Sequence, residues 1–121
     1  MALTTEQVTL LDEILEVRIE THSDDGAPKT TIWVVVAEGE VYVRSVNGEK
    51  GLWYQRTISN PFVAIHVDSE RLEFRAVHVK DPDVIAAVSE ALRAKYPPGG
   101  SLDRMTREEV LDTTLHLEPE S

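Results

Sequence analysis

The chain has 121 residues, the length of one ordinary domain, so we expect residues 1–121 to form a single domain. Its composition of 41% hydrophobic and 28% charged residues excludes a disordered chain, and the lack of cysteine excludes disulfide scaffolds, thiolate metal sites and cysteine nucleophiles. The formal net charge of −10 argues against general binding to nucleic acid or to an anionic membrane.

The N-terminal segment predicts a helix over about residues 5–15. Thr4 and Gln7 have the spacing of a capping box, in which each side chain binds the other residue's backbone N–H. Val8 and Leu11 belong to a stripe of apolar residues at helical spacing. The start of the chain lacks the basic and apolar stretches of a secretory signal, so we expect a cytoplasmic protein.

Alternation of apolar and charged residues predicts a first strand over residues 17–20. A turn follows over residues 23–29, which include Asp-Asp-Gly and a proline. Residues 30–37 are nearly all apolar or β-branched, a pattern typical of a strand buried on both faces. Its run Ile32–Ala37 is the longest apolar run in the chain and is too short to cross a membrane.

The middle of the chain predicts a hairpin, a loop and two more strands. Glu38-Gly39 makes a tight turn into a strand over residues 40–46. The next predicted elements are a loop at 47–51, a short helix at 52–59, and strands at 62–67 and 71–79. In the last of these strands the apolar positions change phase after Ala76, which predicts a bulge or corner at Ala76–Val77 that bends the strand around a barrel.

The last third predicts two helices and a final strand. Asp81-Pro82 is a strong helix start, so we expect a helix over residues 82–96 that ends at Pro97–Gly100. Thr106 and Glu109 predict a second capping box and a short helix before a strand at 113–117. The order of elements predicts an α+β fold, a mainly antiparallel six-stranded β-barrel with flanking helices.

The acidic residues gather at the two ends of the chain. The net charge is −6 over residues 1–39, +1 over residues 40–80 and −5 over residues 81–121. One interpretation is an acidic surface that keeps the protein in solution. The other is a small anion site within the more basic central segment, and the sequence leaves both open.

Three sequence segments, taken in order, resemble the split-barrel flavin-binding superfamily. They are Thr30-Thr31-Ile32-Trp33, Val41-Tyr42-Val43-Arg44-Ser45 and Asn60-Pro61-Phe62-Val63-Ala64-Ile65. This superfamily includes the pyridoxamine-phosphate oxidases and the deazaflavin-dependent nitroreductases, and Trp53-Tyr54 is similar to the deazaflavin branch. More closely, the chain looks like a small bacterial family of unassigned function, with a split β-barrel as the expected fold.

The resemblance implies a homodimer with FMN or a deazaflavin bound at the subunit boundary. It places Arg44, Ser45 and Lys50 at the cofactor phosphate, and the backbone from Thr31 to Trp33 along the ring system. It also implies that three further side chains line the same pocket: Trp53, Tyr54 and Arg56.

Arg44 also has interpretations that do not depend on this resemblance. An arginine on a strand of an apolar sheet needs a partner, because an unpaired buried charge is costly. A phosphate matches the guanidinium fork, whereas an internal ion pair with Glu40 or Glu73, or exposure at the strand end, satisfies the arginine without a ligand.

The aromatic residues allow two uses. Trp33, Tyr42, Trp53 and Tyr54 lie within 22 positions and are four of the seven aromatic residues. They can stack on a planar ligand, but packing of the barrel is the commoner use of such side chains. Tyr54 is the candidate catalytic residue, because its hydroxyl can donate a proton to a substrate undergoing reduction.

No sequence motif indicates a metal site or a serine nucleophile. The four histidines have no spacing typical of a metal site, and no serine lies in a glycine-flanked elbow. Two functions therefore remain, each with a small-molecule ligand. One is a flavin- or deazaflavin-dependent oxidoreductase, and the other is a non-catalytic binding or accessory module whose cofactor pocket is closed by aromatic residues. Convergence of Arg44, Ser45 and Lys50 on an open cavity would favour the enzyme.

Overall fold

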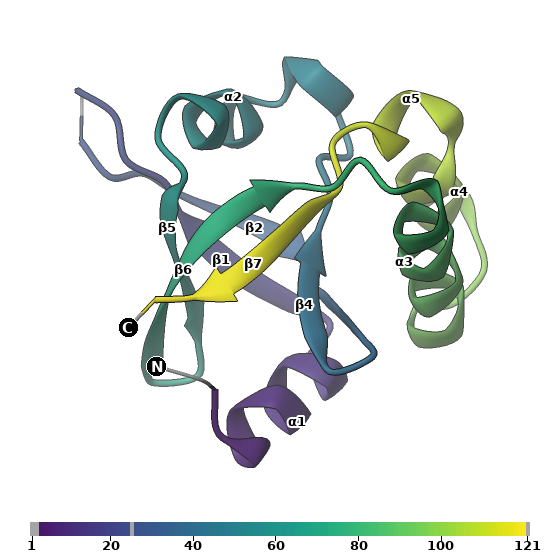
Figure 1. Cartoon of the computed structure of the whole chain (residues 1–121), viewed down its shortest axis with the longest axis horizontal. Helices are drawn as coiled ribbons and strands as arrows, with labels where there is room; N and C mark the ends of the chain where they lie inside the picture. The colour runs from purple at the N-terminus through teal and green to yellow at the C-terminus, as the bar shows by residue number, and fades with distance from the viewer. Residues whose placement is uncertain (1–2, 25, 121) are drawn as a thin grey trace.

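The computed structural model describes residues 3–24 and 26–120, which form one antiparallel sheet curled into a nearly closed barrel with helices around it (Figure 1). The sheet contains β1 (Glu16–Glu20), β2 (Lys29–Trp33), β3 (Val35–Ala37), β4 (Glu40–Val43), β5 (Phe62–Val67), β6 (Glu70–His78) and β7 (Leu115–Pro119). Their order is β2-β1-β5-β6-β7-β4-β3, and every pairing is antiparallel. Because β2 and β3 are the two ends of the sheet and adjoin in sequence, the chain itself nearly closes the barrel.

The helices cover both ends and one side of the barrel. They are α1 (Thr5–Glu13), the 3-10 helix η1 (Gly48–Lys50), α2 (Leu52–Ser59), α3 (Pro82–Lys95), α4 (Gly100–Thr106) and α5 (Glu108–Leu111). Figure 1 shows α1 below the barrel, α2 above it, and α3 to α5 together beyond β4. The predicted α+β class and antiparallel barrel are confirmed. None of the helices in the described part of the chain is both long and apolar enough to cross a membrane.

The barrel has seven strands rather than six because the predicted strand at 30–37 is interrupted at Val34. The backbone N–H of Val34 donates to the hydroxyl of Tyr96 at 3.2 Å, and its carbonyl accepts from Lys95 Nζ at 2.6 Å. Side chains at the end of α3 therefore satisfy backbone groups that would otherwise pair with a strand. The two resulting strands, β2 and β3, are also the edge strands of the sheet. The prediction that this segment is buried on both faces is therefore wrong.

The predicted bulge at Ala76–Val77 is also wrong. The register between β6 and β7 runs without a slip from the pair Phe74–Pro119 to the pair His78–Leu115. Pairing with β5 ends one residue before Ala76, whose N–H then donates to the carbonyl of Pro61. The alternation of apolar residues changes phase where the pairing of β6 with β5 ends. The surroundings of the β6 side chains change at that point, while the backbone of β6 stays regular.

Two of the three predicted helix starts are confirmed. Thr4 and Gln7 form a reciprocal capping box on α1, and Asp81 accepts a hydrogen bond from the N–H of Asp83 at the start of α3. The capping box predicted for Thr106 is wrong, because that hydroxyl donates backward to the carbonyl of Leu102. These two residues belong to α4, which the sequence pattern did not predict.

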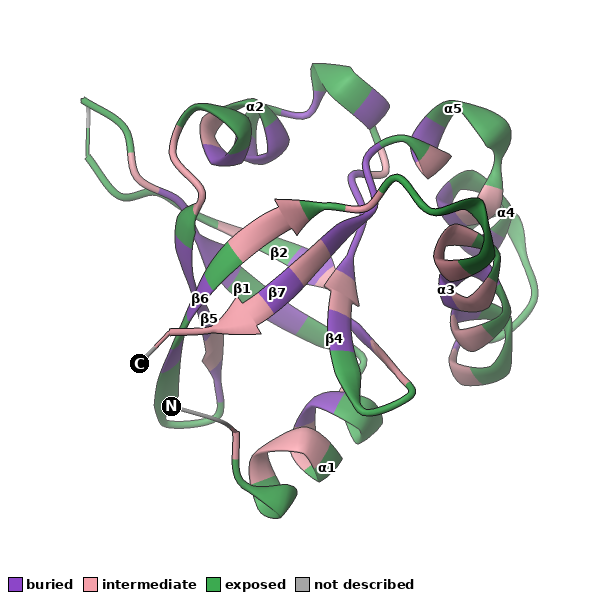
Figure 2. Cartoon of the chain, viewed as in Figure 1, coloured by how far each residue is buried: buried purple, intermediate pink, exposed green. Residues whose placement is uncertain are grey.

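Two clusters of buried side chains hold the fold together. Figure 2 marks the buried positions, which alternate with less buried ones along β4 and β7. The larger cluster fills the barrel, where Ile19, Ile65 and Phe74 are completely buried. The smaller cluster joins Val35 of β3 to α3 and α4. Full burial of one such side chain contributes about 1.5–3 kcal/mol. The second cluster fixes α4 beside the barrel and so positions one wall of the site described next.

Candidate functional site

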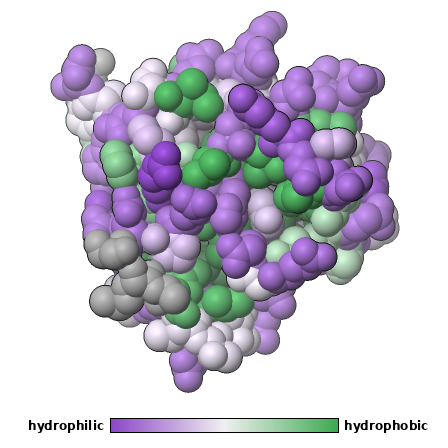
Figure 3. Space-filling model, viewed as in Figure 1, coloured by the Kyte–Doolittle hydropathy of each residue, from purple (hydrophilic) through white to green (hydrophobic). Residues whose placement is uncertain are grey.

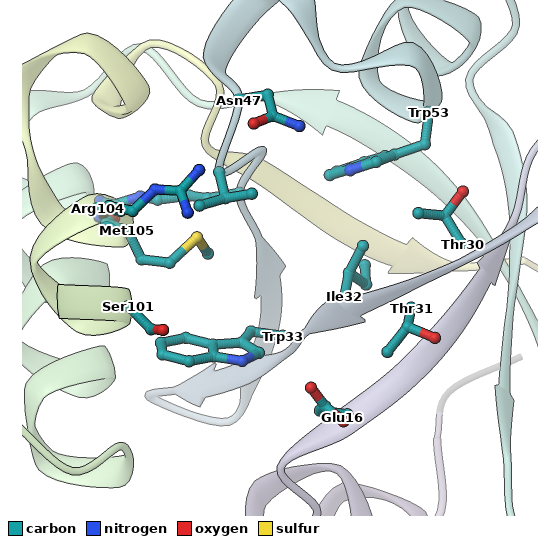
Figure 4. Close-up of a pocket in the computed structure, with 12 residues that line it drawn as sticks. Glu16, Thr30, Thr31, Ile32, Trp33, Asn47, Trp53, Ser101, Arg104 and Met105 are labelled. Atoms are coloured by element: carbon teal, nitrogen blue, oxygen red, sulfur yellow. Dashed lines mark hydrogen bonds between the residues drawn. The ribbon is translucent and has the colours of Figure 1, made fainter. Parts of the chain in front are cut away.

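A cleft of about 320 Å³ lies between the barrel and α4 (Figure 4). Its lining comes from β1, β2, α2, α4 and the segment around the end of β4. The lining residues are Glu16, Thr30, Thr31, Ile32, Trp33, Arg44, Val46, Asn47, Trp53, Ser101, Arg104 and Met105. The volume is at the lower end of small-molecule sites, which run from roughly 300 to 1,000 Å³. The cleft therefore suits a ring system rather than a complete dinucleotide.

Two indole rings stand on opposite sides of this cleft (Figure 4). Trp33 stacks on Tyr96 with ring centroids 3.7 Å apart and planes inclined by 2°. The Tyr96 hydroxyl is held in turn by the backbone of Val34. Trp53 is buried and meets Tyr54 edge-on, with centroids 6.2 Å apart. Both indoles are thus fixed by neighbouring side chains, which makes the cleft preorganised for a flat, apolar ligand.

Arg44 follows β4 and is only 2% exposed. Its Nε donates to Thr114 Oγ1 at 2.8 Å and one terminal nitrogen donates to Ser89 Oγ at 2.9 Å. The same nitrogen donates to the carbonyl of Met105, and the other terminal nitrogen donates to the carbonyl of Ile85 at 2.8 Å. Neither ion pair considered for this arginine is present, because all four acceptors are uncharged oxygens. Arg44 lines the cleft with most of its donors already engaged.

The environment of Arg44 disfavours its charge. Burial lowers the pKa of Arg44 to about 10, and the nearby charge of Arg93 acts in the same direction. The guanidinium remains protonated at neutral pH, so a positive charge is held inside the protein beside the cleft.

Ser45 and Lys50 do not join Arg44 at the cleft. Ser45 is 1% exposed, and its hydroxyl oxygen is buried without a hydrogen-bond partner among the described residues. Gly51 packs against it so closely that a Cβ at Gly51 would lie 2.3 Å from this oxygen. Lys50 is exposed in η1 and does not line the cleft. The three residues expected at a phosphate therefore do not converge, so the feature expected to favour the enzyme over the binding module is absent.

Arg56 and Tyr54 also lie outside the cleft. Arg56 Nε donates to Thr21 Oγ1 at 2.8 Å, and its side chain lines a separate open depression with His22 and Asp24. Tyr54 packs in the barrel core, where burial raises its pKa, as does the charge of Glu49 to a smaller extent. Of the eight residues predicted from the sequence, the structure thus brings Thr31, Trp33, Arg44 and Trp53 together at one cleft.

The sequence prediction missed the wall contributed by α4. Ser101, Arg104 and Met105 line the cleft at positions i, i+3 and i+4 of this helix, which places them on one face. This spacing was the available indication. The run Pro97–Gly100 obscures it, because these residues are also typical of the end of the preceding helix. Asn47, in the loop after β4, was also missed.

A second polar cluster lies on the outer face of the barrel. The carboxylate of Glu20 on β1 contacts His22 at 3.1 Å, His66 at 2.8 Å and Arg71 at 2.7 Å. Its hydrogen bond with Arg71, aided by His66, lowers the pKa of Glu20 to about 2 despite burial. The cluster ties β1 to β5 and β6, because Glu20, His66 and Arg71 lie on these three strands.

The cleft can bind a ligand, but its lining offers little acid–base chemistry of its own. Glu16 is the one carboxylate among its lining residues, and no histidine lines it. Threonine hydroxyls, the Asn47 amide and two guanidinium groups supply polar contacts instead. Such a site can position a ring and an anionic group, with any redox chemistry coming from a bound cofactor.

Three solved structures with the same fold carry the names of a pyridoxamine 5'-phosphate oxidase, an FAD binding protein and an F420 reductase. The chain resembles a putative pyridoxamine 5'-phosphate oxidase from Listeria innocua, with a TM-score of 0.70, 13% identity, and coverage of 96% of this chain and 92% of that one. The FAD binding protein from Mycobacterium smegmatis matches with a TM-score of 0.63 and 22% identity, and the match covers 98% of this chain and 92% of that one. An F420 reductase matches with a TM-score of 0.60 and 19% identity, and the match covers 93% of this chain and 92% of that one. At these identities the comparisons show the fold alone, and they confirm the expected split-barrel fold.

The sequence itself matches one family model over almost its whole length. The model is described as "Uncharacterized protein conserved in bacteria (DUF2255)", and it matches residues 7–117. No curated protein matches the sequence. The matched range includes both indoles, Arg44 and the α4 wall of the cleft. The chain therefore belongs to the bacterial DUF2255 family.

Proposed function

We propose that this protein binds a flavin or a deazaflavin in the cleft and acts as an oxidoreductase on a small organic molecule. One observation carries the proposal: a ring-sized cleft lies between two fixed indoles, Trp33 and Trp53. A tricyclic ring with an extended π-system is complementary to such walls. The similar structures named above support this choice of ligand, because their names include FAD and F420, and F420 is a deazaflavin.

The residues of the cleft fit this group in separate roles. The indoles of Trp33 and Trp53 would contact the ring faces or edges, and Ile32 and Met105 would exclude water from it. Thr31 is exposed on β2 and would offer a hydroxyl to the polar edge of the ring. A bound flavin or deazaflavin would supply electron-pair transfer, a chemistry that the side chains of this chain lack.

Tyr54 is kept in the proposal as the candidate proton donor, although it packs in the barrel core outside the cleft. Its raised pKa keeps the hydroxyl protonated at neutral pH, as a donor requires. Its position behind Trp53 means that only a test of turnover can assign it a role. In Tyr54→Phe the proposal predicts unchanged cofactor affinity and slower substrate reduction. Equal rates in the two proteins would remove Tyr54 from the mechanism.

The proposal includes a homodimer. Leu52, Ile58 and Phe62 are each more than half exposed, and all three lie on α2 or at the start of β5. Exposed apolar side chains that gather on one part of a small protein mark an interface. The outer surface seen in Figure 3 is otherwise mainly hydrophilic, with hydrophobic side chains in separate patches.

Titration with FMN and with a deazaflavin tests binding. The flavin fluorescence should be quenched to saturation, because stacked indoles quench flavin emission. Thr31→Trp places a large ring at the cleft and should weaken binding by about tenfold or more. Thr9→Trp, at an exposed position of α1, is the matched control and should bind as the wild type does. Absence of binding to both cofactors, or equal binding by both variants, would contradict the proposal.

Turnover distinguishes the enzyme from a binding module. The protein with reduced cofactor is mixed with a quinone or a nitroaromatic compound, and reoxidation is followed by the return of cofactor absorbance. An enzyme should accelerate reoxidation relative to free cofactor. A module that only binds the cofactor should leave the rate unchanged or reduce it, and this result would favour the second function.

A further inference from the structure

The α4 end of the cleft carries a free cation. Arg104 lines the cleft and is exposed, and it makes no hydrogen bond or ion pair with any residue in the described ranges. Figure 4 shows it entering the cleft from α4 beside Met105, one turn after Ser101 and facing Asn47. Six of the other seven arginines are bonded to protein oxygens in the described structure, and Arg18 is the remaining exception. Arg104 is therefore a donor available to a ligand.

A second positive charge lines the same cleft and has no ionic partner among the described residues. Arg44 lines the same cleft, and its four hydrogen bonds all go to uncharged oxygens. A buried charge that is solvated only by neutral dipoles gains strongly from an anion placed nearby. The one carboxylate of the lining, Glu16, is drawn beside Trp33 and Thr31 in Figure 4, away from Arg104. The charge at this end of the cleft is thus locally positive within a protein of net charge −10.

We infer that Arg104, with Asn47 and Ser101, forms a binding site for a phosphate monoester group at the α4 end of the cleft. A phosphate monoester carries a charge close to −2 at neutral pH, matching the two guanidinium groups. Its oxygens accept several hydrogen bonds, matching the fork of Arg104, the amide of Asn47 and the hydroxyl of Ser101. This anion site goes beyond the proposed function, because it does not depend on which ring occupies the rest of the cleft.

The overall negative charge does not prevent such a site. At physiological ionic strength, charges more than about 8–10 Å away are largely screened, whereas a direct guanidinium–phosphate contact is not. Bidentate pairing with Arg104 would therefore outweigh the distant carboxylates. Arg44 would act mainly through its charge, since only one of its five N–H donors is left without a protein acceptor.

Binding of phenyl phosphate, compared with phenol, tests the inference by calorimetry. Wild type should prefer phenyl phosphate, and the preference should fall as salt is added. Arg104→Gln should weaken phenyl phosphate binding by about tenfold or more and leave phenol binding unchanged. Arg104→Lys should retain part of the affinity, because it keeps the charge but loses the fork. Arg75→Gln removes an equal charge from the exposed strand β6 and is the matched control.

The possible outcomes distinguish failure of the anion site from failure of the proposed cofactor binding. Equal phenyl phosphate affinity in wild type and Arg104→Gln, or an equal loss in Arg75→Gln, would overturn the anion site. FMN and riboflavin are then compared with the same variants. If phenyl phosphate binds through Arg104 but neither FMN nor a deazaflavin binds, the anion site stands and the proposed function fails. If FMN and riboflavin bind equally and Arg104→Gln changes neither, the cofactor site stands and the anion site fails.

Discussion

Replacement of Arg44 by alanine should destabilise the folded protein, and not only weaken the binding of a ligand. The guanidinium of Arg44 bonds Ile85 and Ser89 of α3, the carbonyl of Met105 in α4, and Thr114 just before β7. One side chain thus joins the end of β4 to three segments that follow it far along the chain. Loss of these bonds should loosen the packing of α3 and α4 against the barrel.

The expected loss of stability follows from two opposing contributions. Four hydrogen bonds from a charged donor contribute about 6 kcal/mol in total, at about 1.5 kcal/mol each. Burial of the charge, which lowers the pKa of Arg44 to about 10, costs about 3 kcal/mol. Arg44→Ala should therefore lower the free energy of unfolding by about 3 kcal/mol, and the melting temperature by roughly 10 °C.

Urea unfolding without ligand, followed by circular dichroism, measures this loss. Arg44→Met keeps most of the side-chain volume and should be less destabilising than Arg44→Ala by about 1 kcal/mol. Arg75→Ala, at an exposed position of β6, should change stability by less than about 0.5 kcal/mol. If Arg44→Ala is no more destabilising than Arg75→Ala, the guanidinium does not hold the helices and the reasoning is refuted.

Three further predictions concern acid stability, packing and assembly. Because the pKa of Glu20 is lowered from 4.5 to about 2 in the folded protein, its stabilising effect is complete above pH 4.5 and is lost as the pH falls towards 2. The stability difference between wild type and Glu20→Gln in urea unfolding should therefore shrink over this range; a constant difference would argue against the prediction. Gly51→Ala should lower the melting temperature, because its Cβ would lie 2.3 Å from Ser45 Oγ, and a second substitution, Ser45→Ala, should restore part of the loss. Light scattering should give twice the mass of the chain for wild type and the single-chain mass for Phe62→Arg, whereas Leu15→Arg, at an exposed position outside α2 and β5, should remain dimeric.

Local chemistry made much of the fold predictable. The caps at Thr4 and Asp81, and the turn at Glu38-Gly39, depend on residues within a few positions, and all three are present in the structure. At this turn both residues have positive φ, 52° for Glu38 and 80° for Gly39, as a two-residue hairpin requires. The α+β barrel followed from these elements and from their order.

The predictions that depended on distant partners were less successful. Val34 continues a pattern typical of a strand, but Lys95 and Tyr96 bind its backbone from more than 60 positions away and divide the strand. The sequence allows a phosphate or an ion pair as the partner of Arg44, whereas its four acceptors are neutral oxygens that lie 41 to 70 positions further along the chain. A neutral set of acceptors cannot be identified from sequence, because every residue offers a backbone carbonyl.

The sequence by itself determined most of the elements of this protein and their order, and its resemblance to the split-barrel superfamily indicated four of the residues that line the cleft. Periodicity and capping decide the elements, because they act between residues close in the chain. The tertiary structure alone decided that Ser45 is buried away from the cleft and that α4 brings Arg104 to it. The packing of α4 against α3 and the barrel decides which cations share the cleft, and that packing is a property of the whole chain.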